Sequence, residues 1–186
     1  MKKRLFLFAM ILGMWSVAFG QPREWGYHGG ATVLLSEVNG ANALSAGMTA
    51  GVSNGRVMVG VYGLKDVTPA QRPTYESTLE EYGFQGTFLY PVTSRLNLDF
   101  GLRLGRGEAG MEAIQKHISE GTQVEKVWAA SPEVGIEFPL TRHLSLAYVG
   151  GYRWLWGAEN LEDVGCGSYS SFYTALSLRA GFFPGR

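Results

Sequence analysis

The sequence is poor in charge and in cysteine, and it has no long hydrophobic run after its first twenty residues. Charged residues make up 17% of the chain, against roughly 25% in an average soluble domain. The formal net charge of +0 gives no support to a nucleic-acid-binding surface. The single cysteine excludes an internal disulfide framework and a cysteine-based zinc site. No later segment reaches ~18 consecutive apolar residues, so no transmembrane helix is predicted there.

Glycine and aromatic residues are abundant instead. The chain has 26 glycines in 186 residues, about twice the usual ~7%, and 13% aromatic residues. The glycines follow no Gly-X-Y period, which excludes collagen. Apolar residues make up 46% of the chain, which argues against intrinsic disorder. The length allows one domain.

The N-terminus has the three parts of a secretory signal peptide. Residues 2–4 are basic, residues 5–17 are apolar, and Ala18 and Gly20 are small residues at the positions that a signal peptidase reads. The apolar stretch is shorter than the ~20 residues of a spanning helix. We therefore predict a signal peptide over 1–20, cleaved before Gln21, and one exported domain over 21–186.

The rest of the chain alternates between large apolar and small or polar residues. The clearest case is the segment 96–104, in which Leu96, Leu98, Phe100, Leu102 and Leu104 occupy every second position. This period of two indicates β-strands. Eight such segments occur, at 25–36, 44–53, 56–62, 82–90, 96–105, 128–138, 144–156 and 172–182. Most are about ten residues long, as a tilted membrane-spanning strand requires, whereas globular strands are nearer ~5–6 residues.

The connections between these segments alternate in length. Asn54-Gly55 is a two-residue hairpin signal, and 91–95 and 139–143 are also short. Longer polar connections are expected at 65–80, 106–122 and 157–168. Tight turns on one side and long loops on the other are typical of outer-membrane barrels, and an even strand number puts both termini on the periplasmic side. Residues 90–98 also match residues 138–146, which indicates a duplicated hairpin.

The size of the side chains predicts which face is inside. An eight-stranded barrel has an interior only just wide enough for side chains. The bulky face is therefore expected to meet lipid, and the face rich in Gly, Ser and Thr to line the lumen. The charged residues of this small face are expected to pair in a lumen network, with the inward glycines leaving room for the long arginines. These charged residues are Arg56, Asp99, Arg103, Glu133, Glu137, Arg153 and Arg179.

Aromatic residues gather near the ends of the predicted strands, as in the two interfacial girdles of membrane barrels. On the periplasmic side these are Trp25, Tyr27, Tyr90, Phe138, Phe182 and Phe183. On the outer side these are Tyr82, Trp128, Trp154, Trp156 and Phe172.

With these features the chain resembles the small eight-stranded outer-membrane barrels, of the OmpA transmembrane-domain and OmpX type. The resemblance covers 21–186 and rests on the architecture, the Pro-x-Thr turns at Pro91 and Pro139, and the closing segment 176–183. It implies an all-β, antiparallel up-and-down transmembrane barrel in the outer membrane of a Gram-negative-type bacterium. It also implies a monomer in contact with membrane lipid and lipopolysaccharide, inserted by the barrel-assembly machinery. Members commonly end in an aromatic residue, whereas Phe183 is followed here by three more residues.

Two His-x-Ser pairs are candidates for chemistry, since histidine can activate a serine nucleophile. They are His143 with Ser145, at a periplasmic turn, and His117 with Ser119 and the following Glu120, in an outer loop. Such pairs could serve a lipid A hydrolase, but we expect turn and loop structure at both. No cluster has metal-ligand spacing, and no cofactor is predicted.

A few single residues carry smaller expectations. We expect His28 to fill the lumen and Cys166 to be a free thiol. We expect Glu76, Glu80 and Glu81 to be solvated in an outer loop, with divalent-cation bridging to lipopolysaccharide phosphates as the functional alternative. Pro132 falls inside the sixth strand, where a bulge is expected, or a strand that pairs fully only after it.

The sequence therefore predicts an outer-membrane barrel with a side-chain-filled lumen and a structural or surface-interaction role, and no enzyme. A narrow porin-like channel and a lipid A-modifying enzyme are the alternatives. The surface ligand is not predictable from these residues.

Overall fold

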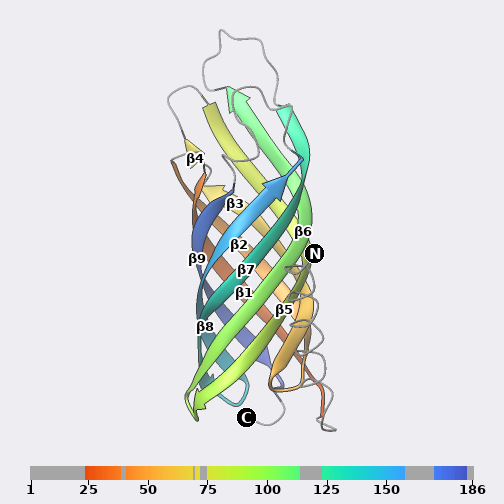
Figure 1. Ribbon diagram of the computed structural model, residues 1–186, viewed down its shortest axis with the longest axis vertical. Coiled ribbons are helices and arrows are strands. Elements are labelled where there is room, and N and C mark those ends of the chain that lie inside the picture. The colour runs from red at the N-terminus through yellow and green to blue at the C-terminus, as the bar shows by residue number, and fades with distance from the viewer. Residues whose placement is uncertain are drawn as a thin grey trace, which may run out of the picture.

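The computed structural model describes residues 24–38, 41–68, 70–71, 75–113, 123–157 and 170–183. The described strands wind around a common axis as a tall barrel (Figure 1). Their bounds are β1 (Gly26–Val38), β2 (Ala41–Ser53), β3 (Val57–Thr68), β4 (Ala70–Gln71), β5 (Tyr75–Thr93), β6 (Leu96–Ala113), β7 (Gln123–Thr141), β8 (Leu144–Trp156) and β9 (Ser171–Gly181). Two-residue β4 pairs only with the start of β5, so eight strands form the wall.

The wall is closed. Each strand pairs antiparallel with its neighbour along the chain, β1 pairs with β9, and β3 pairs with β5 past the short β4. This confirms the predicted all-β, eight-stranded antiparallel up-and-down barrel. Each of the eight wall strands therefore has a partner on both sides, and none is an edge strand over its whole length. The described part of the chain holds no helix with the length and apolar character needed to cross a membrane.

The period-two alternation sorts the side chains between the two faces of the wall. In β9 the residues alternate strictly between buried and exposed from Ser171 to Ala180. Large apolar side chains point outward, and Met48, Phe84 and Phe172 are 75%, 73% and 77% exposed. Polar side chains point inward and are buried. The polar face therefore lies inside and the apolar face outside, the reverse of a water-soluble barrel.

Tight turns join the strands at one end, the short-turn end, where the described chain also begins and finishes (Figure 1). Gly55 has a positive φ of 84°, the left-handed conformation that glycine adopts without strain. The Asn54 side chain accepts hydrogen bonds from the backbone N–H groups of Arg56 (3.2 Å) and Val57 (2.8 Å). The Asn-Gly pair therefore forms the predicted hairpin turn between β2 and β3.

The two copies of the internal repeat fold alike. The register shifts between Pro91 and Thr93 at the end of β5, and between Pro139 and Thr141 at the end of β7. In each copy the threonine Oγ1 accepts a hydrogen bond from the backbone N–H two residues later, at 3.2 Å and 3.1 Å. The Pro-x-Thr motif thus makes a bulge and a capped turn, which gives the duplication a structural basis.

The strands at the opposite end, the loop end, are longer than predicted. β5, β6 and β7 have 19, 18 and 19 residues, and they rise above the other strands on one side (Figure 1). Much of 65–80 and 106–122, expected to be loop, is therefore strand. Polar residues in these segments suggested loops, but a strand that continues beyond the apolar band can carry charge on both faces.

Pro132 is accommodated without a bulge. β7 pairs with β8 at Ala130↔Trp154 and again at Glu133↔Gly151, and no pair joins the two strands between these points. The register is the same on both sides of the gap, and Pro132 still pairs with Leu102 of β6. Because proline has no N–H to donate, the ladder to one neighbour is interrupted while the other is kept.

Candidate functional site

The lumen holds ion pairs that reach across the barrel. Near the short-turn end, Arg179 of β9 donates from Nη1 to Asp99 Oδ2 of β6 (3.0 Å) and to Glu137 Oε2 of β7 (2.8 Å). Asn97 Nδ2 donates to the other oxygen of Glu137 at 3.3 Å. Both carboxylates have 0% exposure. One arginine therefore neutralises two buried carboxylates and ties β9 to strands two and three positions away in the ring.

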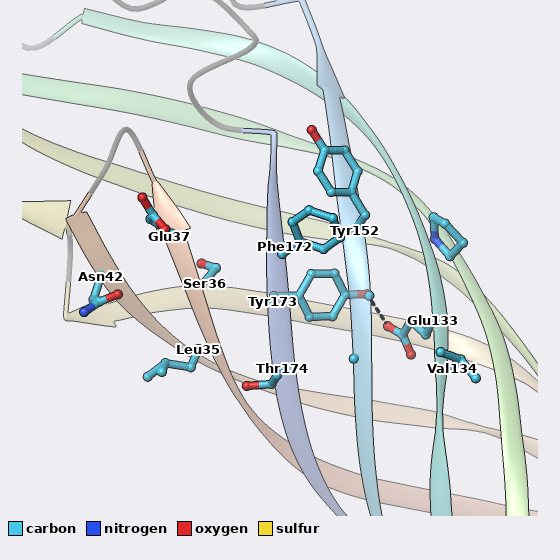
Figure 2. Close-up of a pocket in the computed structure, with 13 residues that line it drawn as sticks. Leu35, Ser36, Glu37, Asn42, Glu133, Val134, Tyr152, Phe172, Tyr173 and Thr174 are labelled. Atoms are coloured by element: carbon cyan, nitrogen blue, oxygen red, sulfur yellow. Dashed lines mark hydrogen bonds between the residues drawn. The ribbon is translucent and has the colours of Figure 1, made fainter.

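A second group lies in the middle of the lumen. Arg103 Nε lies 2.6 Å from Glu133 Oε1, and the Tyr173 hydroxyl donates to the same oxygen at 2.8 Å (Figure 2). The Arg103 guanidinium also lies over the rings of Tyr62 and Tyr173, at 5.6 Å and 6.0 Å from their centroids. These contacts combine ion pairing with cation–π attraction in a space closed to solvent.

A third group follows toward the loop end. Arg153 Nη1 lies 3.7 Å from Glu81 Oε2, and Nη2 donates to Ser36 Oγ at 3.3 Å. The Tyr62 hydroxyl donates to the other Glu81 oxygen. Arg153 and Glu81 are 2% and 1% exposed. Since Tyr62 also contacts Arg103, the second and third groups are continuous.

The structure differs from the predicted network at one of its seven residues. Arg56 is exposed in the hairpin turn before β3 and does not enter the lumen. Two inward carboxylates take part instead: Glu81, which was expected in a solvated loop, and Asp66, which accepts from Ser45 Oγ (2.6 Å) and the Leu79 N–H (2.8 Å). Extending the alternation of 82–90 back by one residue would have placed Glu81 inside. The ion pairs of the described lumen thus join three arginines to four carboxylates, and Asp66 adds a further inward carboxyl group that is held by hydrogen bonds.

The inward glycines serve two purposes, of which only one was expected. A Cβ added to Gly101 would meet Glu133 Oε2 at 3.2 Å, and one added to Gly151 would meet the Tyr173 hydroxyl at 2.6 Å. These glycines make room for the partners of Arg103 more than for the arginine itself. At Gly51 and Gly60, which pair across β2 and β3, a Cβ would instead meet the backbone of the neighbouring strand.

Apolar side chains close the short-turn end of the lumen. Phe183, just after β9, is 3% exposed and packs in one cluster with Met58 and Leu89. Its ring stacks on His28, with centroids 6.4 Å apart. His28 lies in the lumen, at the position where a filler was expected. The neighbouring Phe182 points outward and is 44% exposed, so the two terminal aromatics lie on opposite faces of the wall.

Ten of the eleven predicted girdle residues are exposed, from 40% at Phe138 to 77% at Phe172, whereas Phe183 is buried in the lumen and is not part of a girdle. At the loop end, cross-strand pairing places Tyr82, Arg106, Trp128 and Trp156 in one row across β5 to β8. The Arg106 guanidinium lies 5.3 Å from the Tyr82 ring centroid. This arginine within the aromatic row was not anticipated, because 106–122 was expected to be a loop.

A row of charged residues lies two positions further toward the loop end. Pairing connects Lys65 to Glu80, Glu80 to Glu108, and Glu108 to Lys126, across β3, β5, β6 and β7. Lys65 Nζ lies 3.1 Å from Glu80 Oε2, with both side chains largely exposed. We call these four residues and Arg106 the outer charged belt.

The candidate catalytic pair does not assemble. His143 is exposed in the turn after β7, and its ring Nδ1 lies 3.1 Å from the Gly181 carbonyl oxygen. Ser145 is fully buried, and its Oγ has no hydrogen-bond partner. His117, Ser119, Glu120 and Cys166 lie outside the described residues. Within the described ranges no group of three or more His, Cys, Asp or Glu side chains could hold a metal ion.

Solved structures resemble this barrel in fold but not in sequence. Neisserial surface protein A superposes with a TM-score of 0.65 at 13% identity, covering 85% of this chain and 97% of that one. The N-terminal β-barrel domain of Pseudomonas aeruginosa OprF gives 0.53 at 10% identity, with 83% and 97% covered. A major outer membrane protein of Thermus thermophilus gives 0.50 at 11% identity, with 86% and 100% covered.

No protein-family profile and no curated protein matches the sequence. The similarity to known proteins therefore lies in the architecture alone. The chain has the fold of the small eight-stranded outer-membrane β-barrels.

Proposed function

We propose that the protein is an outer-membrane β-barrel with a filled lumen, in a structural or surface-interaction role. The apolar outer wall, the aromatic rows near both ends and the polar interior support a bilayer as the surrounding medium. The expected signal peptide over 1–20 and the barrel domain over 21–186 fit export to that membrane, where the barrel-assembly machinery would insert the chain. The fold shared with outer-membrane barrels supports the same location.

The observation that carries the proposal is the occupied lumen. Arg103 and Arg153 with their carboxylate and tyrosine partners fill it from the loop end to the middle, and Arg179 and Phe183 close the short-turn end. An eight-stranded barrel leaves no further width for a continuous water column. The lumen therefore holds the strands together and does not conduct.

Planar-bilayer recording tests this proposal against a narrow porin-like channel. We expect no steady single-channel steps from the wild-type protein. A variant with Arg103→Ala and Arg153→Ala, which removes two side chains that cross the lumen, shows whether the assay detects an opened barrel. Steady steps of constant size from the wild type would contradict the filled lumen.

Lipopolysaccharide is the proposed partner at the loop end. Arg106 lies within the aromatic row and the other four residues of the outer charged belt lie just beyond it toward the loop end, at the level expected for lipid phosphates. Three members of the belt are cationic: Lys65, Arg106 and Lys126. Arginine and lysine are the usual phosphate ligands of proteins. The paired carboxylates of Glu80 and Glu108 could share a divalent cation with a phosphate, whereas Glu81 faces the lumen and cannot take part.

A binding measurement with purified lipopolysaccharide tests this partner. Neutralising Lys65, Arg106 and Lys126 to Gln should weaken binding about tenfold or more, since each lost cation costs about 0.5–1 kcal/mol near a surface. The matched control neutralises Arg95 and Arg142, which are exposed in the turns of the opposite end. Equal weakening by both sets would count against a site at the loop end.

A further inference from the structure

The outer wall is hollowed where β7 and β8 fail to pair. A groove of about 680 Å³ lies over β7, β8, β9 and the loop ends of β1 and β2 (Figure 2). It is lined on its outward side mainly by Leu35, Val134, Tyr152 and Phe172, with Pro132 at the interruption. Ligand pockets for small organic molecules have volumes of ~300–1,000 Å³.

Two local features of the sequence create this hollow. Pro132 interrupts the β7–β8 ladder, so the two strands are unpaired from Ser131 to Pro132 on one side. Gly150 then supplies no side chain where an outward residue would stand. One cross-strand row consists of Val134, Gly150, Thr174 and Leu35. Because Gly150 has no side chain, the groove is open at this point of the row.

The groove has a rigid aromatic edge. The Tyr152 ring packs edge-to-face against Phe172, with centroids 4.8 Å apart, and against Trp154 at 5.2 Å. These rings contact one another, so little conformational freedom remains to be lost when a ligand binds. Side chains cover the rest of this outer face. The narrow apolar groove between them therefore favours one slender apolar ligand.

Ser36, Glu133 and Tyr173 line the groove from the lumen side and are buried, whereas two exposed polar residues lie at its loop end. Glu37 and Asn42 are paired across β1 and β2, and both are exposed. The carboxylate and amide oxygens accept hydrogen bonds, and Glu37 adds a negative charge. This end therefore favours a cationic hydrogen-bond donor over an anionic group.

We propose that this groove binds one acyl chain of a phospholipid with an ammonium head group, present beside the lipopolysaccharide of the loop-end leaflet, with the head beside Glu37. The inference rests on the proposed membrane location, which brings lipid chains to this wall. The chain lies over Gly150 and Thr174, between Val134 and the Tyr152–Phe172 pair. The outer charged belt is separate: it occupies β3, β5 and β6, and its one residue on β7, Lys126, lies six residues from Pro132 toward the loop end.

A pair of glycine variants tests the groove without disturbing the fold. The nearest heavy atom to a Cβ on Gly150 is the Tyr173 carbonyl oxygen at 3.9 Å, so Gly150→Leu places its side chain in the groove without a clash. Gly63 also faces outward with no heavy atom within 4 Å, and its strand β3 lies four positions from β8 in either direction around the ring. Gly63→Leu is therefore the matched control on the opposite side.

The measurement is a titration in detergent with lyso-phosphatidylethanolamine and lyso-phosphatidylglycerol, followed by native mass spectrometry. The wild type and Gly63→Leu should each bind one lyso-phosphatidylethanolamine, and Gly150→Leu should bind it at least about tenfold more weakly. Glu37→Gln should reduce the preference for the ammonium head about two- to fivefold, as expected for a solvent-exposed ion pair.

Two results would overturn the proposal. Equal affinity in Gly150→Leu and Gly63→Leu would exclude the groove as the site, and an equal or greater affinity of the wild type for lyso-phosphatidylglycerol would exclude the ammonium preference. Each variant is also checked for altered gel mobility on boiling, which reports a folded barrel. A wild type that never inserts into bilayers contradicts the membrane location itself, whereas an inserted wild type without lipid selectivity contradicts the groove alone.

Discussion

Arg179 shows most clearly what a single lumen residue does. Its guanidinium neutralises Asp99 and Glu137, both of which have 0% exposure. A buried pair need not stabilise a protein relative to apolar residues, but the loss of one partner leaves an uncompensated buried charge. Arg179 is therefore needed to compensate the buried negative charges of these two carboxylates.

Arg179→Met should lower the free energy of unfolding by about 3–5 kcal/mol. Urea titration of the folded band on unboiled gels measures this loss. The control Arg95→Ala, at an exposed turn position, should change stability by no more than about 0.5 kcal/mol. Adding Asp99→Asn and Glu137→Gln to Arg179→Met should recover much of the loss, and a failure to recover would place the effect in packing and not in charge.

Some residues could be assigned from the sequence and others could not. The parity of Asp99, Arg103 and Glu137 fixed their inward direction, because a period of two allows only two faces. The exposure of Arg56 depended on where the hairpin turn ends, and strand ends are poorly defined by alternation. Phe183 was expected in the periplasmic girdle, although the alternation of 172–182, continued by one residue, points its side chain into the lumen.

Pro132 is the defining irregularity among the strands. The sequence showed that a proline falls inside a strand of a closed barrel, but not which neighbour would lose its pairing. In the structure Pro132 remains paired with β6 and is not paired with β8. This choice matters because the released side coincides with Gly150, which turns a pairing defect into a groove.

Pro132→Val should restore an N–H donor between β7 and β8. The expected result is slower amide hydrogen exchange in residues 151–154 of β8, because a buried ladder protects its amides from solvent. Val134→Ala in the same strand, which adds no donor, serves as the control. Unchanged exchange in Pro132→Val would mean that the gap is held open by something other than the missing donor.

The aromatic rows fix where the strands enter the bilayer interfaces. Single-tryptophan proteins that retain Trp25 or Trp128 should be quenched more by lipids brominated near the head group than by lipids brominated near the chain ends, since aromatic girdles lie at the interface. A tryptophan placed at Leu102, midway along the wall, should show the reverse order. Quenching of Trp25 or Trp128 in the same order as this inner control would contradict the girdle assignment.

At the scale of the whole molecule, the amino-acid composition follows from an apolar outer face and a polar inner face of the wall. Bulky apolar side chains cover the outside, glycines allow strands and lumen partners to come close, and the few charged residues of the strands gather in the lumen and the outer charged belt. The eight-strand count and the antiparallel order followed from the alternation and the turn signals. The height of the wall did not, because strands β5 to β7 continue beyond the apolar band with charged residues on both faces.

Spin-label accessibility at the outer wall tests the central claim that this wall faces lipid. After Cys166→Ser, single cysteines replace Leu102 or Val134, which point outward and are 45% and 57% exposed, or Arg95 in a short turn. In reconstituted bilayers the labels at 102 and 134 should be more accessible to oxygen than to a water-soluble nickel chelate, and the label at 95 should show the opposite. Chelate access at 102 and 134 equal to that at 95 would contradict a membrane-facing wall.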